Sequence, residues 1–320
     1  MRRQLVARLW QSLIVVGIVT TISFFVIRTA PGDPFSYEAR NLTPAVREHL
    51  RESFGYNKPV PVQFLRYVSS IAHGELGWSF VKHEPVSTAL AEALPRTLLL
   101  VGIALGLAFA FGVIVGVLQA ANAGRWLDRV SSTVLLGFYS LPDFWAALMI
   151  LLLFAYWLPW FPAGRIVDPV MHSYMGPWAA FVDRLKHLVL PVGSLALLTT
   201  ASISRYQRAA MLETLPSDFI RTARAKGLPE RQIIWRHALR TAFTPMITVL
   251  GLMLPALIGG AVFIEKVFDW PGMGLLATQA VSARDYDVVT ATVILGAIMV
   301  LVGNLFADLL QMLIDPRVRE

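Results

Sequence analysis

A polar segment between two long apolar runs carries the residues with the clearest chemistry. Residues 217–240 read SDFIRTARAKGLPERQIIWRHALR. Ser217 can cap a first short helix by accepting hydrogen bonds from free backbone amides, and Asp218 suits the positive end of that helix dipole. Gly227 permits a left-handed turn that ends the helix, and Pro229 suits the first turn of a second helix. The segment therefore predicts two short helices joined by a sharp turn.

The first predicted helix has two faces that could make different contacts. Its apolar or small face carries Phe219, Ile220, Ala223 and Gly227. The basic side chains lie elsewhere and can pair with acidic groups on a partner. A small-residue face lets a partner approach the backbone closely. We therefore predict a protein contact through Ser217, Asp218, Arg221, Ala223, Arg224, Lys226 and Gly227.

The motifs of common enzymes are missing from the sequence. It has no GxxxxGK[ST] phosphate loop, so the chain is not expected to hydrolyse ATP itself. It has no GxSxG elbow and no HExxH helix. It contains no cysteine, which excludes disulfides and thiolate metal sites, and its six histidines are scattered. These observations predict a chain that is not an enzyme and that holds no metal or cofactor.

The composition predicts a membrane protein. Of the 320 residues, 56% are hydrophobic and only 15% are charged, and the mean hydropathy is +0.59. Such a balance is far from that of a soluble globular domain. The net charge is +7, but the sequence lacks the basic stripe with interleaved aromatic residues that is typical of nucleic-acid binding. Basic residues in so apolar a chain sort membrane topology and meet anionic lipid headgroups, so we expect lipid contact and no nucleic acid.

Six apolar runs approach the ~20 residues that cross a bilayer. They predict an all-α membrane protein with spans at 9–27, 97–123, 130–160, 188–204, 241–264 and 288–307. The fourth is the weakest, because Pro191 and Gly193 interrupt it and Arg205 ends it early. Basic residues concentrate at the N-terminus and in 205–240, which places both termini and that loop in the cytoplasm.

The long hydrophilic stretch before residue 95 is expected outside the membrane. Val46, Leu50 and Phe54 recur every four residues, and a second amphipathic stretch carries Phe64, Leu65, Val68 and Ile71. This region either caps the membrane domain or docks a partner protein. The predicted organisation is a first span with an extracytoplasmic region at 1–93, a transmembrane core at 94–313 containing the 205–240 loop, and a cytoplasmic tail at 314–320.

Three polar residues inside predicted spans are candidates for a transport pathway. Asp143 follows Pro142 near the middle of the third span, where a proline kinks a helix and an ionisable group should face protein or water. Asn304 and Asp308 lie in or near the sixth. All three could equally hold helices together. An alternative function is an ion-coupled carrier or channel that uses Asp143 and Asp308 directly.

Nine short stretches, in order along the chain, carry a resemblance to a known family. They are APGDP at 30–34, GELGWS at 74–79, LPRTL at 94–98, SLPDFW at 140–145, RTARAKGL at 221–228, RHALR at 236–240, DWPGMG at 269–274, ARDY at 283–286 and DPR at 315–317. Together they resemble the inner-membrane permease subunit of a bacterial ATP-binding-cassette importer of the peptide and nickel branch of type I.

That resemblance implies a type I importer permease fold in which 217–227 forms the coupling helix. The family's Glu-Ala-Ala motif falls on Arg221, Thr222 and Ala223, so only the last alanine and Gly227 are kept. It further implies a second permease subunit, related or identical, two cytoplasmic ATPases that hold ATP and magnesium, and an extracytoplasmic solute-binding protein. The expected function is half of an alternating-access pathway in the bacterial inner membrane, for peptides first, then nickel complexes or other small solutes.

Overall fold

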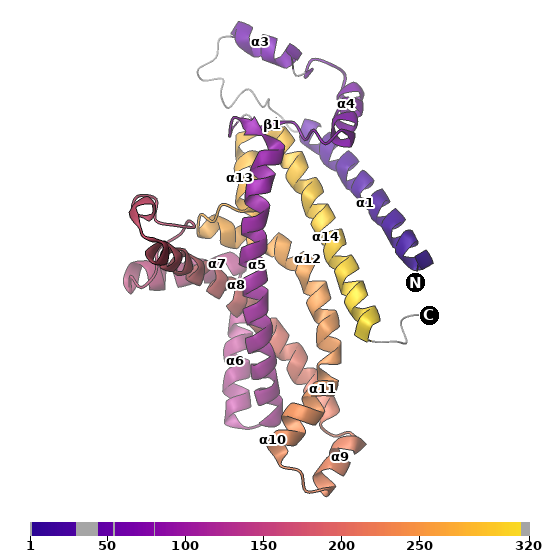
Figure 1. The fold of residues 1–320 in the computed structure, drawn as a ribbon, viewed down its shortest axis with the longest axis vertical. Helices are drawn as coiled ribbons and strands as arrows, with labels where there is room; N and C mark the ends of the chain where they lie inside the picture. The colour runs from indigo at the N-terminus through magenta and orange to yellow at the C-terminus, as the bar shows by residue number, and fades with distance from the viewer. Residues whose placement is uncertain (1, 30–43, 54, 80, 315–320) are drawn as a thin grey trace. The chain divides into compact units, whose positions relative to one another are not determined.

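The chain folds as a set of helices with one very short strand pair (Figure 1), as the apolar runs predicted. The computed structural model describes residues 2–29, 44–53, 55–79 and 81–314. Phe54, most of the predicted tail and the APGDP and DPR stretches lie outside the described residues. The elements are α1 Arg2–Thr29, α3 Pro44–Ser53, α4 Val60–Ala72, β1 Trp78–Ser79, β2 Glu84–Pro85, α5 Val86–Ala121, α6 Trp126–Ser140, α7 Asp143–Leu151, a π-helix Leu152–Trp157, a 3-10 turn His172–Tyr174, α8 Pro177–Thr214, α9 Asp218–Ala225, α10 Glu230–Gln232, a π-helix Ile233–Ala238, α11 Leu239–Ala242, α12 Thr244–Val267, α13 Met273–Ala283 and α14 Tyr286–Ile314.

The described helices account for four or five of the six predicted spans. Within the described part of the chain, four helices are long and apolar enough to cross a membrane, and the bent pair α6 and α7 could make a fifth. The four are Trp10–Thr29, Val86–Ala121, Pro177–Thr214 and Tyr286–Phe306. Helix α12, Thr244–Val267, covers the predicted fifth span. Six spans therefore remain a prediction.

The predicted third span is broken rather than kinked. Helices α6 and α7 meet at an angle of 105°. Leu141 between them has an extended backbone, with φ −82° and ψ 140°. The ring of the following Pro142 clashes with a helical conformation at the residue before it, which explains the break. The prediction of one continuous, kinked helix was therefore wrong, and Asp143 begins a new helix.

The predicted fourth span is, in contrast, the longest helix. Helix α8 runs 38 residues and passes through Pro191 without a break. It also continues well past Arg205, so both expected interruptions were wrong. Pro191 is buried, and α8 packs against α6, α7, α11 and α12. Packing on several sides stabilises this continuous helix, because neighbouring helices can compensate for the hydrogen bond that proline removes.

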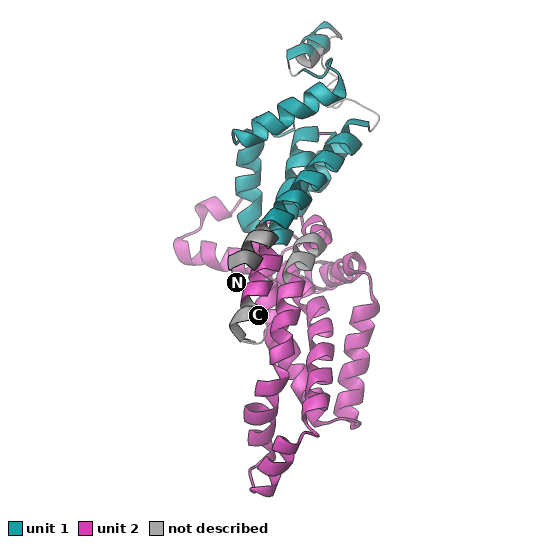
Figure 2. Ribbon diagram, turned by 90° about the vertical axis from the view of Figure 1, so that its right-hand side faces the viewer, with its two compact units in different colours: residues 1–97, 271–301 teal, residues 98–270, 302–320 magenta. Residues whose placement is uncertain are grey.

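The chain divides into two compact units, 1–97 with 271–301 and 98–270 with 302–320 (Figure 2). In the first unit, one face of α5 packs against α13 and the start of α14. The buried core consists of Val86, Ala89, Leu90, Ala93, Met273, Leu276, Ala280, Val288 and Ala291. The Thr97 hydroxyl accepts a 2.8 Å hydrogen bond from the Met273 amide, which fixes the start of α13. The predicted division at residues 93 and 313 is a sequence assignment that these units do not test.

Helix α4, predicted as amphipathic, is held to α1 by aromatic rings. Phe24 lies 5.3 Å from Phe64 and 5.4 Å from Tyr67 between ring centroids. The Arg28 guanidinium lies 4.1 Å from the centre of the Tyr56 ring. Burial raises the pKa of Tyr56 and of Tyr67, so both phenols stay neutral at ordinary pH. An aromatic cluster around Arg28 therefore holds α1 and α4 together.

The second unit is organised around α8, and α5 approaches it through two glycines. A Cβ atom built on Gly112 would lie 2.6 Å from the Ile203 side chain. One built on Gly116 would lie 2.6 Å from the carbonyl oxygen of Ser204 and 3.0 Å from the amide of Arg208. The GxxxG spacing therefore brings two backbones into direct contact, as small residues do between membrane helices. This contact positions α8, which leads directly into the 217–240 segment.

Candidate functional site

The first predicted short helix is α9, and its start differs in detail from the prediction. Ser217 occupies the N-cap position with an extended backbone, φ −66° and ψ 155°. Its hydroxyl donates to the carbonyl of Thr214 at 2.6 Å and caps no amide of α9. The predicted side-chain cap was therefore wrong. Ser217 instead ties α9 to the last residue of α8, because Thr214 ends that helix.

The predicted turn at Gly227 is confirmed. Gly227 has φ +75°, and its amide donates to the carbonyl of Arg224 at 2.9 Å. Pro229 then directly precedes α10, which begins at Glu230. A Cβ atom on Gly227 would meet no atom within 4 Å. The glycine is required by the backbone conformation alone, and the space around it is open.

The small face of α9 turns toward its own chain. Ile220 is fully buried and Ala223 is 7% exposed. They share a core with Met211 of α8 and with Ile233 and Ala238 of the π-helix that follows α10. The prediction that Ala223 admits a partner to the backbone was therefore wrong, since this chain already covers it. The same packing joins α9 to the end of α8.

The exposed face of α9 carries the charges and one aromatic ring. Asp218, Arg221, Arg224 and Lys226 are exposed, and Phe219 is 45% exposed. Protruding aromatic rings beside arginines are typical of protein-binding hot spots. Among the predicted contact residues, these charged side chains therefore remain available to a partner, together with the open backbone at Gly227. Phe219, assigned to the small face by sequence reasoning, also belongs to this exposed surface.

Two internal ion pairs shape this surface. Arg221 lies 3.3 Å from Asp218, one turn away on α9. Arg224 donates two hydrogen bonds to Glu230, at 2.7 and 3.2 Å, across the turn at Gly227. The hydrogen bond from Arg224 lowers the pKa of the Glu230 carboxyl. Exposed pairs contribute little to stability, but this one bridges α9 and α10 and orients the arginine.

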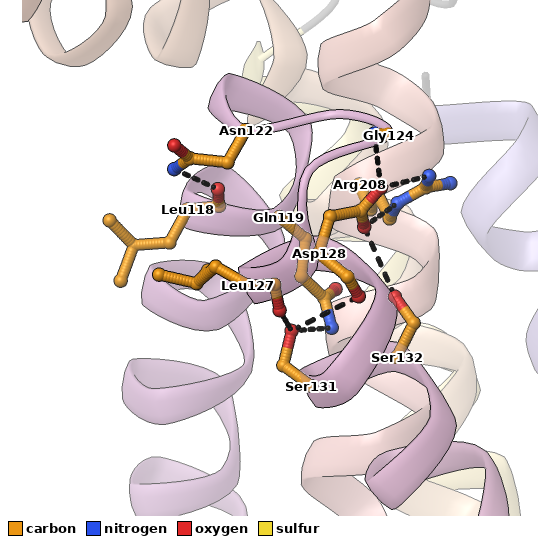
Figure 3. Close-up of polar contacts among 9 residues, drawn as sticks. All are labelled: Leu118, Gln119, Asn122, Gly124, Leu127, Asp128, Ser131, Ser132 and Arg208. Atoms are coloured by element: carbon orange, nitrogen blue, oxygen red, sulfur yellow. Dashed lines mark hydrogen bonds and ion pairs between the residues drawn. The ribbon is translucent and has the colours of Figure 1, made fainter.

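A buried ion pair that sequence reasoning missed joins α6 to α8 (Figure 3). Asp128 is 3% exposed, and Arg208 donates to its two carboxylate oxygens at 2.8 and 2.9 Å. The amide of Gly124 and the hydroxyl of Ser132 donate to the same carboxylate, at 2.9 and 3.2 Å. An aspartate in the first turn of a helix was visible in the sequence, but its partner 80 residues away was not.

The neighbouring polar contacts complete this joint. Gln119, which is 2% exposed, donates from its amide to Ser131 at 3.2 Å, and the Ser131 hydroxyl donates to the carbonyl of Leu127 at 2.6 Å (Figure 3). The end of α5, the start of α6 and α8 are therefore fixed together. Because Arg208 lies on the helix that leads into α9, this joint fixes the base from which α9 projects.

The three predicted pathway residues lie at two places in the second unit. Asp143 is the first residue of α7 and is exposed. An acidic group there faces the positive end of the α7 dipole, which gives it a structural role as well. Asn304 and Asp308 lie one turn apart on α14, the first exposed and the second half-buried. Their part in a pathway remains a prediction.

Within the described ranges, no group of three or more His, Cys, Asp or Glu side chains could hold a metal ion. The nearest arrangement is Asp183 between two imidazoles, with His172 Nδ1 2.7 Å and His187 Nδ1 3.2 Å from its carboxylate oxygens. The amide of Asp168 also donates to Asp183, at 3.1 Å. These contacts hold the segment before α8 against that helix.

The long apolar helices define a helical membrane protein that carries a charged, exposed face on α9. Two family models match the sequence. The model for the binding-protein-dependent transport system inner membrane component matches residues 112–320, and the model for the N-terminal part of such membrane components matches residues 1–101. The chain belongs to this family of inner-membrane permease components. It is a transport subunit and not an ATPase.

Full-length relatives of the chain are also permease proteins of transport systems. It is 36% identical to the oligopeptide transport system permease protein AppB of Bacillus subtilis, over 99% of each chain. It is 37% identical to the di/tripeptide transport system permease protein DppB of Pseudomonas aeruginosa, over 94% of each chain. Among solved structures, a chain of the inward-facing MetNI methionine ABC transporter matches with a TM-score of 0.52 and 21% identity, covering 72% of this chain and 95% of that one. This last likeness concerns the fold, which is that of a type I importer permease.

Proposed function

We propose that this chain forms one half of the translocation pathway of an ATP-driven importer for peptides or similar small solutes. The observation that carries the proposal is its 36% identity to an oligopeptide permease over 99% of each chain. A second full-length relative is named for di- and tripeptides. Short peptides are therefore the first solutes to test. The same relatives favour an importer subunit over a carrier that uses Asp143 and Asp308 alone.

The proposed assembly contains a second, related permease, two ATPase subunits that hold ATP and magnesium, and an external binding protein. Both termini and the 205–240 loop would lie in the cytoplasm, as the distribution of basic residues predicts. The exposed face of α9 would dock on an ATPase. Since Ile220 packs against Met211 of α8 and Ser217 bonds to Thr214, a displacement of α9 would move α8 with it. ATP-driven closure would then reach the spans as a rigid-body movement.

The test uses the importer with its partner subunits, reconstituted with its binding protein. We expect ATP-dependent uptake of labelled di- to pentapeptides, and we expect Gly227→Leu to abolish uptake while ATP hydrolysis continues. A Cβ atom at Gly227 meets no atom within 4 Å, so we expect the added bulk to act on a docked partner.

Gly74→Leu is the matched control. Gly74 also has a positive φ, +82°, and open space around it, and it lies outside the Asp128–Arg208 joint, so leucine imposes the same backbone strain of roughly 1–3 kcal/mol. We expect this variant to retain most of its uptake. Normal coupling in Gly227→Leu would refute the docking surface, whereas ATP-driven uptake of another solute and of no peptide would refute the solute class alone.

A further inference from the structure

Two cavities lie end to end along one face of α8, on the side that packs against α6 and α7. The smaller one, about 190 Å³, is lined from α8 by Ala201, Ser204, Arg205 and Arg208. The larger one, about 650 Å³, is lined from α8 by Val189, Leu190, Gly193 and Leu197. Residues spaced by three or four share a face of a helix, so Val189 to Arg208 forms one continuous stripe. The other walls come from α6, α7 and the π-helix Leu152–Trp157, with Phe161 at the larger cavity and Gln119 of α5 at the smaller one.

The smaller cavity has a positive charge, on Arg205, that forms no ion pair with the described residues. Arg208 at its wall is paired with Asp128. Arg205 has no ion pair with any residue the structure describes. Its guanidinium instead stacks over the Tyr139 ring, 4.4 Å from the ring centre, and it is exposed. Tyr139 and Tyr206 are also hydrogen-bond partners of this guanidinium, and the Tyr206 ring centre lies 5.7 Å from it. A guanidinium carries five N–H donors, so those that remain can donate to a phosphate or carboxylate.

The larger cavity is apolar throughout. Its walls include Phe138, Leu141, Trp145, Met149 and Phe154, and no lining side chain is charged. The leucines Leu135 and Leu136 at the smaller cavity continue this apolar wall toward Arg205. A molecule that fills both cavities must therefore be anionic at one end and hydrocarbon at the other. Free phosphate or a polar peptide would match only the polar end.

From this polarity we infer that the α6–α8 groove, defined by these two cavities, binds one anionic phospholipid. Its phosphate meets Arg205, and an acyl chain lies in the apolar cavity along Leu197 and Gly193. The length agrees, because the 12 residues from Arg205 to Gly193 span ~18 Å of helix. One leaflet of hydrocarbon is ~15 Å thick. A bound lipid would fill the space beside the Asp128–Arg208 joint and steady α8 against α6.

The experiment measures phospholipid retention by the purified importer complex with native mass spectrometry, using phosphatidylglycerol as the probe. We expect the wild-type complex to retain one tightly held phosphatidylglycerol. Arg205→Gln should weaken its retention roughly tenfold, as the loss of a charge-assisted hydrogen bond predicts. Gly193→Leu should weaken it as much, because its side chain would occupy the apolar cavity; a Cβ atom there meets no protein atom within 4 Å.

Two matched variants serve as controls. Arg184→Gln removes an exposed arginine from the same helix, and Gly137→Leu adds the same bulk at an open glycine of α6. Neither residue lines either of these two cavities, and both variants should retain the lipid. Assembly with the partner subunits confirms that all four variants fold.

Three results would overturn the inference. The first is unchanged retention in Arg205→Gln or Gly193→Leu. The second is displacement of the lipid by glycerol phosphate, which has the anionic group without acyl chains and would identify a site for free anions or solute. The third is retention by the isolated chain but not by the complex, which would show that the partner permease fills the groove.

Discussion

Replacing Gly116 with leucine is expected to prevent the second unit from folding correctly. The new Cβ atom would lie 2.6 Å from the Ser204 carbonyl oxygen and 3.0 Å from the Arg208 amide, both backbone atoms of α8. Overpacking costs about 1–3 kcal/mol where side chains can shift. A helix backbone cannot shift locally, so we expect a loss of at least roughly 3 kcal/mol, or loss of the folded protein.

Gly106→Leu is the control for this prediction. Gly106 lies on the same helix, and a Cβ atom there meets no atom within 4 Å. Thermal unfolding in detergent, followed together with the yield of monodisperse protein, should separate the two variants. Equal stability of Gly116→Leu and Gly106→Leu would show that α5 and α8 are not in backbone contact.

The second large effect is expected for Arg208→Met. The substitution leaves the Asp128 carboxylate, 3% exposed, with only the Gly124 amide and the Ser132 hydroxyl as donors. Removing one partner of a buried ion pair costs roughly 3–5 kcal/mol, because the other charge stays buried. Arg208 is partly exposed, so we expect the lower end of that range, about 3 kcal/mol.

Adding Asp128→Asn to Arg208→Met removes the stranded charge. The double variant should recover at least about 1 kcal/mol relative to Arg208→Met alone, since the two residues act as one unit. Denaturant unfolding of the four proteins in this cycle measures the coupling. Additive effects of the two substitutions would mean that the pair does not hold α6 to α8.

The two prolines show where sequence reasoning succeeded and failed. Both Pro142 and Pro191 were expected to disturb a span. Only Pro142 does, because Leu141 before it adopts the extended backbone that a following proline favours. At Pro191 the helix continues, since α8 packs against several other helices. The local sequence sets the conformational preference of a segment. Contacts with residues distant in the chain decide whether the segment adopts that conformation.

The candidate site divides in the same way. The position of Gly227 and the existence of α9 followed from the residues themselves, because a positive φ and a helix stop are local properties. The orientation of α9 did not. Which face is buried depends on Met211 and Ile233, residues outside the helix. The Asp128–Arg208 ion pair could not be predicted from the sequence for the same reason, because its two residues lie 80 positions apart.

The central claim is that the exposed face of α9 meets the ATPase of an importer. The chain contains no cysteine, so a single Lys226→Cys substitution gives one unique attachment point. Crosslinking of the assembled importer with a short bifunctional reagent should join this cysteine to the nucleotide-hydrolysing subunit, and a membrane-impermeant thiol reagent added outside intact cells should not reach it. Labelling from outside, or crosslinks that never include the ATPase, would contradict the account.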